Sequence, residues 1–528
     1  MKKIFTLFSA MLMSIASFAT TYNGTLTVTV NGEVSEQPTS VSIDEVNGNY
    51  KLSINNFMLV AGETPLPVGN IVIDHVPGAV NGGLTTLCTN QEIQILAGNV
   101  EGIAEDEWLG PLLGNVPVEM NARFTAEYVV TDIHINMVEL DQVIDVKFEN
   151  VGTHFQMPNS DFETWSTATD NNAPKHWHGF ESVKGKLSGT AKSKTKLVSS
   201  KNVRPGSKGL TSAVVTSTKV FTVIANGTMT NGVLNAGSMY AADASNHSET
   251  DLSSTSKDAN GDPFATPMYA KPDSVKFWMR FTQAKAQASY PYAAFNAVIT
   301  DGTYYQDPEN KTYTNKVAVA APNKADMTVG DWRLVSCPFD YASYAANGAE
   351  AKAILLTVST NATPGKGSYS NGVADSVYVD DLELVYLAGI KSISFKGQAL
   401  DLATIQTTGI ELAADEAVSA ADFEVVKEGE DAKVTKLVEA TADGYVAVIT
   451  AVSADLKTQV AYEINIKKPA APVLKGDING DGVLDVADAS ALIDMVLNSG
   501  TCTEVADVNG DGALDVADVT ELITLILG

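Results

Sequence analysis

Residues 477–497 read DINGDGVLDVADASALIDMVL, and residues 507–527 read DVNGDGALDVADVTELITLIL, so one 21-residue stretch occurs twice near the C-terminal end of the chain. The offset between the copies is 30 residues, and 13 of the 21 positions are identical. Two stretches with this degree of identity indicate two copies of one small structural unit.

Each copy has the pattern of a twelve-residue calcium-binding loop. Ca²⁺ prefers about six to eight oxygen ligands, so carboxylates and amides must recur along one tight turn. Gly482 and Gly512 stand at the sixth position, where the backbone must bend with a positive φ. The predicted ligands of the first loop are Asp477, Asn479, Asp481, the carbonyl group of Val483, Asp485 and Asp488. Those of the second loop are Asp507, Asn509, Asp511, the carbonyl group of Ala513, Asp515 and Asp518.

A helix is expected after each loop and not before it. Apolar residues recur with helical spacing at 492–497 and again at 522–527. Pro472 precedes the first loop, and Gly500 lies in the segment before the second. Residues 477–528 contain 11 acidic residues and no Lys or Arg, so the carboxylates repel each other unless cations are bound. We therefore expect two Ca²⁺ ions to fold this segment.

This duplicated loop-and-helix unit resembles a type I dockerin over residues 475–528. In that family Ca²⁺ folds the module, and its helices dock into a cohesin domain on a scaffold or cell surface. The tenth and eleventh loop positions, often Ser-Thr in cellulosomal dockerins, are here Val486, Ala487, Val516 and Ala517. The resemblance makes these four the predicted partner-binding residues. Because both copies carry Val-Ala, we expect two docking orientations related by a pseudo-two-fold axis.

The composition of the 528-residue chain excludes several classes of protein. Apolar residues make up 45%, enough for several packed domains. The 63 acidic against 35 basic residues give a net charge of −28, which argues against nucleic-acid binding, because that function needs a basic face. The three cysteines, Cys88, Cys337 and Cys502, are too few and too far apart for a disulfide scaffold, and we expect them to be buried and unpaired.

The N-terminus has the pattern of a secretory signal peptide. Two lysines, an apolar run from Ile4 to Ile15 and small residues at Ser17 and Ala19 predict cleavage after Ala19. The apolar run is shorter than the about 20 residues of a membrane-spanning helix, and no other run is long enough to span a bilayer. No Cys follows Ala19, so we expect no lipoprotein anchor. The predicted location is the cell surface or the medium, with the periplasm as the alternative.

Residues 20–156 are predicted to form a β-barrel. Alternating residues at Thr25–Val30 and turn signals at 31–32 and 47–49 indicate hairpins. A further strand is expected at Arg123–Val130. The segment resembles the calycin-like, lipocalin-type barrels found ahead of carbohydrate-related domains in exported bacterial proteins.

Residues 157–388 are predicted to form a jelly-roll β-sandwich. Residues 159–165 read NSDFETW and residues 379–384 read VDDLEL. These segments resemble the first and last strands of galactose-binding-type jelly rolls. The whole region resembles a domain family assigned to carbohydrate metabolism in exported bacterial proteins. This resemblance implies a third, structural Ca²⁺ near Glu163, Asp380 and Asp381.

Four of the five tryptophans lie in this central region. Exposed aromatic rings stack on sugars, whereas tryptophans in general are more often part of a core. The candidates for glycan stacking are Trp165, Trp177, Trp278 and Trp332.

Residues 389–468 are predicted to form a small immunoglobulin-like β-sandwich that acts as a spacer. Residues 469–474, which contain Pro469 and Pro472, are a predicted linker to the dockerin-like module. The predicted fold class is therefore mainly β and multidomain, with a small helical calcium-loop module at the C-terminal end.

Catalytic residues remain unassigned. The sequence contains no G-x-S-x-G, no H-E-x-x-H and no phosphate-binding loop, and its 63 acidic residues do not identify a glycosidase pair. We expect a non-catalytic, glycan-associated protein that a dockerin tethers to a cohesin-bearing partner in polysaccharide utilisation. One alternative is a carbohydrate-active enzyme of the O-glycosyl hydrolase type, with its site in residues 157–388. Another is a surface adhesin, or a carrier that holds a small ligand in the N-terminal barrel.

Overall fold

The computed structural model describes residues 19–60, 65–166, 173–194, 197–469 and 474–528. All but the last residue of the predicted signal peptide and most of the predicted linker lie outside these residues. The described chain forms two compact units. One contains the described residues up to Gln406 together with Ser419–Val438 and Ala447–Glu463, and the other contains Thr407–Val418, Glu439–Val446 and Ile464–Gly528.

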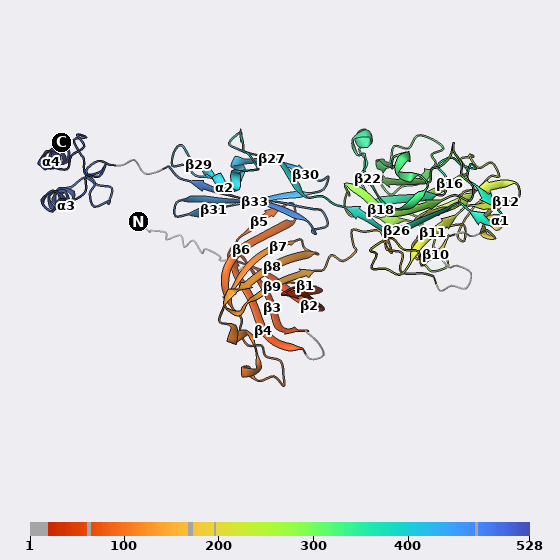
Figure 1. Ribbon diagram of the computed structural model, residues 1–528, viewed down its shortest axis with the longest axis horizontal. Coiled ribbons are helices and arrows are strands. Elements are labelled where there is room, and N and C mark those ends of the chain that lie inside the picture. Colours follow the sequence, from red (N-terminus) through yellow and green to blue (C-terminus); the bar gives the residue numbers. More distant parts are fainter. Residues whose placement is uncertain (1–18, 61–64, 167–172, 195–196, 470–473) are drawn as a thin grey trace, which may run out of the picture. The chain divides into compact units, whose positions relative to one another are not determined.

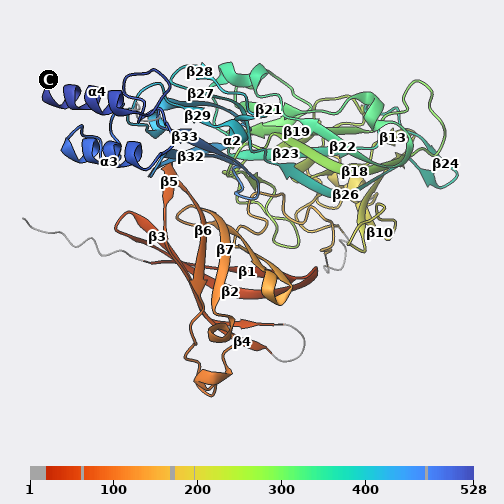
Figure 2. The same ribbon diagram turned by 60° about the vertical axis from the view of Figure 1, so that its left-hand side comes forward.

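The N-terminal domain is one nine-stranded antiparallel sheet that curls into a nearly closed barrel (Figures 1 and 2). Its strand order is β4-β3-β2-β1-β9-β8-β7-β6-β5. The two ends approach where Asn70 and Leu96 exchange backbone hydrogen bonds of 2.7 and 3.2 Å. The strands are β1 (Thr20–Val30), β2 (Glu33–Val46), β3 (Asn49–Leu59), β4 (Leu66–Val76), β5 (Gly78–Asn81), β6 (Leu84–Gln94), β7 (Asn115–Phe124), β8 (Val129–Met137) and β9 (Gln142–Glu149).

Side chains fill the interior of this barrel. Leu26, Ile73, Met120 and Phe148 are among the buried residues that pack there, as the alternation of side chains along each strand requires. The β1–β2 hairpin turns at Asn31 and Gly32, which both have a positive φ, as the sequence indicates.

The predicted strand at Arg123–Val130 is wrong in one respect. β7 ends at Phe124 and β8 begins at Val129. Between them the N–H of Thr125 donates to the carbonyl oxygen of Tyr128 at 2.8 Å, which closes a turn. Residues 125–128 read TAEY and contain no glycine or proline to mark the turn.

The central domain contains two sheets of five strands that share one core. One sheet has the order β10-β11-β26-β18-β22, and the other has the order β14-β23-β19-β21 with β17 paired to β23. Phe277 of β18 stacks on Phe295 of β19 with ring centroids 4.1 Å apart, so the two sheets meet face to face. These strands are β10 (Leu197–Ser200), β11 (Ser212–Thr216), β14 (Thr228–Thr230), β17 (Thr266–Pro267), β18 (Ser274–Thr282), β19 (Ala294–Thr300), β21 (Lys316–Ala320), β22 (Gly330–Pro338), β23 (Ala353–Ser359) and β26 (Ser376–Val385).

Smaller elements complete the central domain. Val298 of β19 and Leu355 of β23 face away from the main core and form a separate apolar cluster with Tyr305 and Tyr313. A three-stranded sheet of order β15-β16-β20 therefore covers part of the outer face of the β19–β23 sheet. The smaller elements are α1 (Ser188–Lys192), β12 (Thr218–Val220), β13 (Val223–Ala225), β15 (Val233–Ala236), β16 (Asn246–Thr250), β20 (Tyr305–Asp307), β24 (Tyr369–Ser370) and β25 (Val373–Ala374).

Residues 389–467 form two further sheets, of orders β28-β27-β30 and β29-β33-β32-β31. Their buried residues include Ile393, Phe423, Ile449 and Ile464. The elements are β27 (Gly389–Phe395), β28 (Gln398–Ala399), α2 (Ile405–Thr408), β29 (Ile410–Glu411), β30 (Phe423–Glu428), β31 (Lys433–Thr441), β32 (Gly444–Val452) and β33 (Gln459–Lys467).

The C-terminal segment contains two helices, α3 (Val486–Leu497) and α4 (Val516–Leu527), which lie side by side (Figures 1 and 2). The helix predicted for each repeat is present, but it begins at the tenth of the twelve loop positions and not after the twelfth. Mainly β architecture with an N-terminal barrel and a short helical C-terminal module is thus confirmed. In the part of the chain that the structure describes, no helix has the length and hydropathy to span a bilayer.

The cysteines differ in exposure. Cys337 is buried as expected, and Cys88 is half-buried. Cys502 is exposed, so the expectation that all three are buried is wrong. Cys502 lies in the segment between α3 and the second loop. This segment is too short to form a core that would bury the thiol group.

Candidate metal site

The first loop is held in shape by its own carboxylates. The Oδ2 atom of Asp477 accepts the N–H of Gly482 at 2.9 Å, and the Oδ1 atom of Asp481 accepts the N–H of Val483 at 2.9 Å. Gly482 has a φ of +82°, so the sharp bend at the sixth position is present. The acidic residues therefore both build the turn and bring oxygen atoms together inside it.

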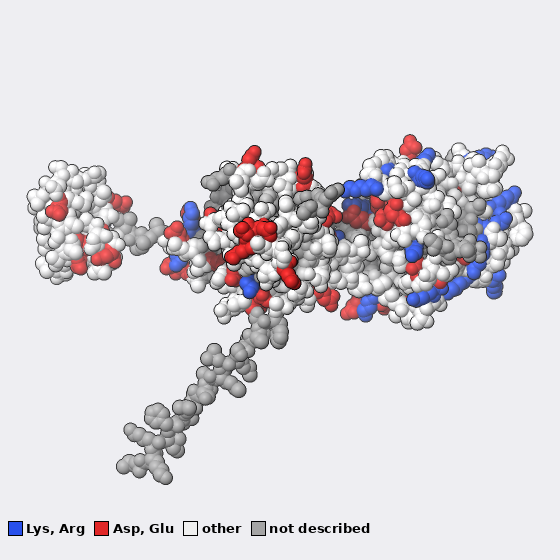
Figure 3. Space-filling model, turned by 90° about the horizontal axis from the view of Figure 1, so that it is seen from below, with Lys and Arg blue, Asp and Glu red and all other residues white. Residues whose placement is uncertain are grey.

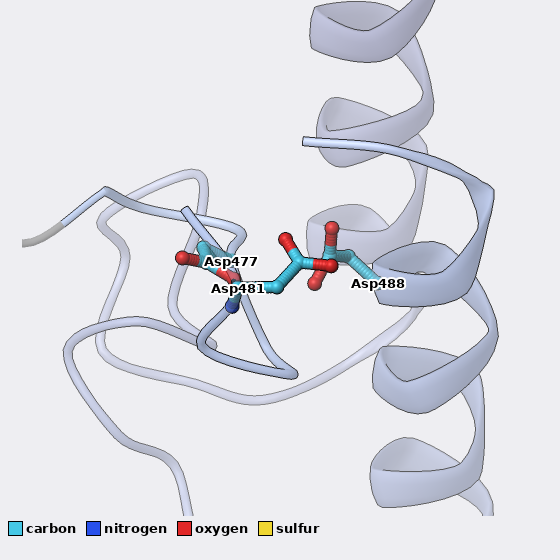
Figure 4. A group of neighbouring side chains, drawn as sticks. All are labelled: Asp477, Asp481 and Asp488. Carbon is cyan, nitrogen blue, oxygen red and sulfur yellow. Dashed lines mark hydrogen bonds between the residues drawn. The ribbon is translucent and has the colours of Figure 1, made fainter. Parts of the chain in front are cut away.

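Three carboxylates converge in this loop. Ligand atoms of Asp477, Asp481 and Asp488 all lie within 4.8 Å of one another. Figure 4 shows Asp477 and Asp481 on the loop and Asp488 at the start of α3, with the carboxylates of Asp481 and Asp488 facing each other. Among the described residues this is the one set of three acidic, His or Cys side chains that is this compact. The atoms of this set that would bind a metal are oxygen atoms, which suit a hard cation such as Ca²⁺.

Asp488 also connects the loop to the helix. Its Oδ2 atom accepts the N–H of Asp485 at 3.0 Å, and its Oδ1 atom accepts the N–H groups of Ile478 and Asn479 at 2.8 and 3.1 Å. Burial alone would raise the pKa of Asp488, but these N–H donors outweigh it and hold the pKa below its usual range. The ionised carboxylate is thus favoured at the residue that forms a capping box with Asp485 and faces Asp481.

Asp485 has a second role that the sequence alone did not assign. It is the N-cap residue of α3, and its side chain accepts the N–H of Ala487 at 2.7 Å. Asp515 does the same for Ala517 at the start of α4. Asp is one of the residues that best satisfies the free N–H groups of a helix N-terminus. One oxygen atom of each of these predicted ligands is therefore already used by its helix.

The second loop repeats this arrangement in a more open form. Asp507 accepts the N–H of Gly512 at 3.0 Å, and Asp518 accepts the N–H of Asp515 at 2.9 Å. The Oδ1 atom of Asp507 is buried and has no hydrogen-bond partner. A buried carboxylate oxygen without a partner is costly unless a cation or water satisfies it. The residues of the second loop therefore also fit a bound cation.

The helices bury one side and expose another. Leu492 of α3 and Leu522 of α4 are fully buried between them. Val486 and Val516 are 72% and 68% exposed, and Ala487 and Ala517 are exposed as well. The four predicted partner-binding residues thus all lie on the surface.

Each helix also exposes apolar residues that our sequence analysis did not assign to a partner. They are Ile493 and Leu497 on α3 and Ile523 and Leu527 on α4. Together with Val486 or Val516 they follow the spacing i, i+7 and i+11, which places them on one face of each helix. Their helical spacing is visible in the sequence, but spacing alone does not tell which apolar residues face the other helix and which face solvent.

Comparison with known protein families identifies both ends of the chain. Residues 475–527 match the family model of the type I dockerin domain, and residues 18–153 match that of the calycin-like β-barrel domain. No curated protein matches the chain. The chain therefore carries a calycin-like β-barrel domain and a type I dockerin domain. Type I dockerins bind Ca²⁺ and attach to cohesin-bearing partners, and proteins that carry them are typically extracellular.

The surface charge agrees with the sequence of the dockerin domain. Figure 3 shows this domain at the left, with Asp and Glu side chains but no Lys or Arg on the face seen. Residues 477–528 contain no basic residue at all.

The structure does not bring Glu163, Asp380 and Asp381 together as a third metal site. Glu163 accepts the N–H groups of Leu210 and Thr211, both at 2.9 Å. Asp380 is buried and accepts N–H groups, and Asp381 pairs with Arg204 at 2.5 Å. Donors of the protein itself thus occupy one oxygen atom of Glu163, both of Asp380 and one of Asp381. The third Ca²⁺ site therefore stays a prediction, and the guanidinium group of Arg204, in the segment between β10 and β11, already pairs with one of its predicted ligands.

The four candidate tryptophans differ in exposure. Trp177 is 1% exposed and hydrogen-bonds to the carbonyl oxygens of Pro158 and Asn159, so it offers no face to a sugar. The expectation for this residue is wrong because its ring belongs to the core. Trp165 packs against the same core, and Arg204 lies over the ring of Trp278 at 5.3 Å. Trp332 is half-buried and contacts Tyr378 edge-on.

Proposed function

We propose that this chain is an exported, non-catalytic, glycan-associated protein that its dockerin domain tethers to a cohesin-bearing partner in polysaccharide utilisation. One observation carries the tethering half of the proposal. Asp477, Asp481 and Asp488 converge at the start of α3, and the same loop is repeated before α4. We propose two Ca²⁺ ions, one in each loop.

The residues of the loop link cation binding to the helix. When bound, Ca²⁺ supplies the positive charge that offsets the repulsion between neighbouring carboxylates. Asp488 holds the N–H groups of Ile478 and Asn479 on one side and that of Asp485 on the other. An ordered loop therefore fixes the first turn of α3, and with it the position of Val486.

The docking surface that we propose consists of the exposed apolar face of each helix. Val486, Ile493 and Leu497 form it on α3, and Val516, Ile523 and Leu527 form it on α4. An apolar face repeated on two related helices can present the same contacts to a partner in two orientations. Apolar residues exposed in this way are typical of a protein interaction surface.

A pull-down with the immobilised full chain tests the tether. With Ca²⁺ present, we expect proteins of the source organism's lysate and culture fluid to be retained, and a cohesin domain to be identified among them by mass spectrometry. Asp477→Ala combined with Asp507→Ala should abolish retention, as should a chelator. Asp494→Ala, which removes an exposed acid of α3, is the matched control. Equal retention by the double variant and the control would overturn the tethering half.

The glycan half rests on the resemblance of residues 157–388 to carbohydrate-related domains. A glycan array probed with the full chain tests it directly. The enzymatic alternative predicts release of reducing sugar from a polysaccharide panel, whereas the binding function predicts none.

A further inference from the structure

The central domain contains a cavity of about 530 Å³ that none of the predicted sites uses. It lies on the outer face of the β19–β23 sheet, away from the main core, and its walls come from β13, β15, β16 and α1. Figure 1 shows α1, β12 and β16 at one end of this domain. The volume is within the range of about 300–1,000 Å³ that is usual for small-molecule sites.

Strand register explains the polar floor of the cavity. Asn296 of β19 lies opposite Thr357 of β23, and Ala294 lies opposite Ser359. Because side chains alternate along a strand, all four point away from the core that Phe295 enters on the other face. The sheet therefore presents amide and hydroxyl groups to the cavity instead of the apolar groups of its inner face.

Four lining residues carry a buried polar atom with no hydrogen-bond partner. They are Asn226 (Oδ1), Asn235 (Oδ1), Ser248 (Oγ) and Thr357 (Oγ1). Ser248 is only 2% exposed. The amide nitrogen of Asn226 donates to the carbonyl oxygen of Asn361 at 2.9 Å, which fixes its orientation and leaves Oδ1 needing a donor. Buried polar atoms are normally satisfied, so this concentration around one cavity points to a hydrogen-bonding ligand.

The charge of the cavity restricts that ligand. No Lys or Arg is among its described lining residues, so nothing there would pair with a phosphate or carboxylate. His247 hydrogen-bonds through Nδ1 to the carbonyl oxygen of Ala244 and through Nε2 to Glu249, both at 2.9 Å, so its charge is already paired. Apolar side chains such as Val183, Val223 and Leu234 also line the cavity.

Asp307 is the one carboxylic acid among the described residues that line the cavity. Burial raises its pKa, and the amide nitrogen of Asn296 donates to it at 3.0 Å. Glycoside hydrolysis needs two carboxyl groups on either side of the bond that breaks. One lining carboxyl group therefore suits binding better than hydrolysis.

We propose that this cavity binds one neutral mono- or disaccharide unit, with Asn226, Asn235, Ser248 and Thr357 hydrogen-bonding to its hydroxyl groups and the aliphatic lining residues contacting its C–H faces. The inference rests on the proposed glycan role and gives that role a site. It replaces Trp165, Trp278 and Trp332 as the place where the sugar is held.

Saturation-transfer NMR and calorimetry on the full chain test this proposal. The probes are glucose, galactose, mannose, N-acetylglucosamine, cellobiose and lactose. The chain offers a closely matched pair of variants, because Thr250 also has a buried, unpartnered hydroxyl group but does not line the cavity. Thr357→Val should weaken binding of the best probe about fivefold to tenfold, whereas Thr250→Val should leave it unchanged.

Further variants distinguish sugar binding in the cavity from sugar binding at an exposed tryptophan. Ser248→Ala should weaken binding like Thr357→Val, and thermal unfolding of each variant checks that it folds. Loss of binding in Trp332→Ala, with Thr357→Val and Ser248→Ala unchanged, would overturn the cavity as the site and leave the glycan role standing. If none of these probes binds while the glycan array is positive for larger glycans, the cavity proposal is also overturned. A negative array together with no probe binding would overturn both.

Discussion

The carboxylate of Asp488 accepts the backbone N–H of Asp485 at 3.0 Å, so the last position of the first loop also completes the capping box of α3, whose N-cap residue is Asp485. The same carboxylate lies within 4.8 Å of ligand atoms of Asp477 and Asp481. A change in the charge of the loop is therefore felt at the first turn of α3. One side chain thus connects the candidate metal site with α3.

Replacing Asp488 by Asn should weaken Ca²⁺ binding at the first loop. The amide supplies one oxygen in place of two, and its NH₂ group would face the N–H groups that the carboxylate now accepts. We expect Ca²⁺ affinity to fall at least about tenfold, or about 1.4 kcal/mol, as measured by calorimetry. Asp494→Asn makes the same change at an exposed position of α3 and should leave affinity unchanged. Similar affinities for the two variants would contradict the assignment of Asp488 as a ligand.

Removal of Ca²⁺ should unfold the dockerin domain and spare the rest of the chain. Hydrogen exchange measured by mass spectrometry can follow peptides of α3 and α4 in the full chain with and without chelator. With Ca²⁺ at about 100 times its dissociation constant, we expect stabilisation of about 2.7 kcal/mol and exchange slowed about a hundredfold. Peptides from the buried strand β18 provide the internal control. Unchanged protection of both helices in chelator would show that they fold without metal.

Two docking orientations predict a specific pattern of variants. Val486→Lys or Val516→Lys alone should leave partner binding nearly intact, because the other helix can still present its apolar face. The double variant should lose binding, since neither face remains. Leu525→Lys is a control of the same chemistry at an exposed residue outside the repeated i, i+7, i+11 face. Loss of binding in either single variant, measured by calorimetry with the captured cohesin, would indicate a single orientation.

The stability of the central domain should depend on the protonation of Asp380. Burial raises the pKa of this carboxyl group to about 6, and the charge of Asp381 acts in the same direction. In an unfolded chain the pKa of an aspartate side chain is about 3.9. The folded state thus binds this proton more tightly than the unfolded state does. Protonation of Asp380 therefore stabilises the folded state below about pH 4, and this contribution is lost as the pH rises through about 6.

Asp380→Asn tests this pH dependence, because Asn cannot titrate. From pH 4.5 to 7.5 the wild-type protein should lose about 1 kcal/mol of stability relative to the variant. The difference in Tm between the two proteins should then change by about 2–4 °C. Scanning calorimetry of the central-domain transition measures it. Asp331→Asn, at an exposed residue of the same sheet, is the control. A constant difference in Tm across this range would mean that Asp380 is ionised throughout.

Local signals predicted the parts of the fold that local chemistry controls. The turn at Asn31 and Gly32, the two calcium loops and the helices after them all follow from residues close together in the chain. The turn between Phe124 and Val129 escaped prediction because it lacks a glycine or proline signal. The roles of Asp485 and Asp515 as caps escaped because a ligand pattern and a capping pattern use the same residue.

The sequence by itself determined the dockerin domain, since in each repeat the predicted ligands and the capped helix lie within one twelve-residue loop and the turns that follow. Only the tertiary structure decided which tryptophans are buried and that Arg204 pairs with Asp381. The cavity also forms only in the tertiary structure. Ser248 and Thr357 lie on strands about a hundred residues apart in the chain, and sheet packing brings them to the same cavity. Contacts of that kind depend on strand order and register, which no short stretch of sequence encodes.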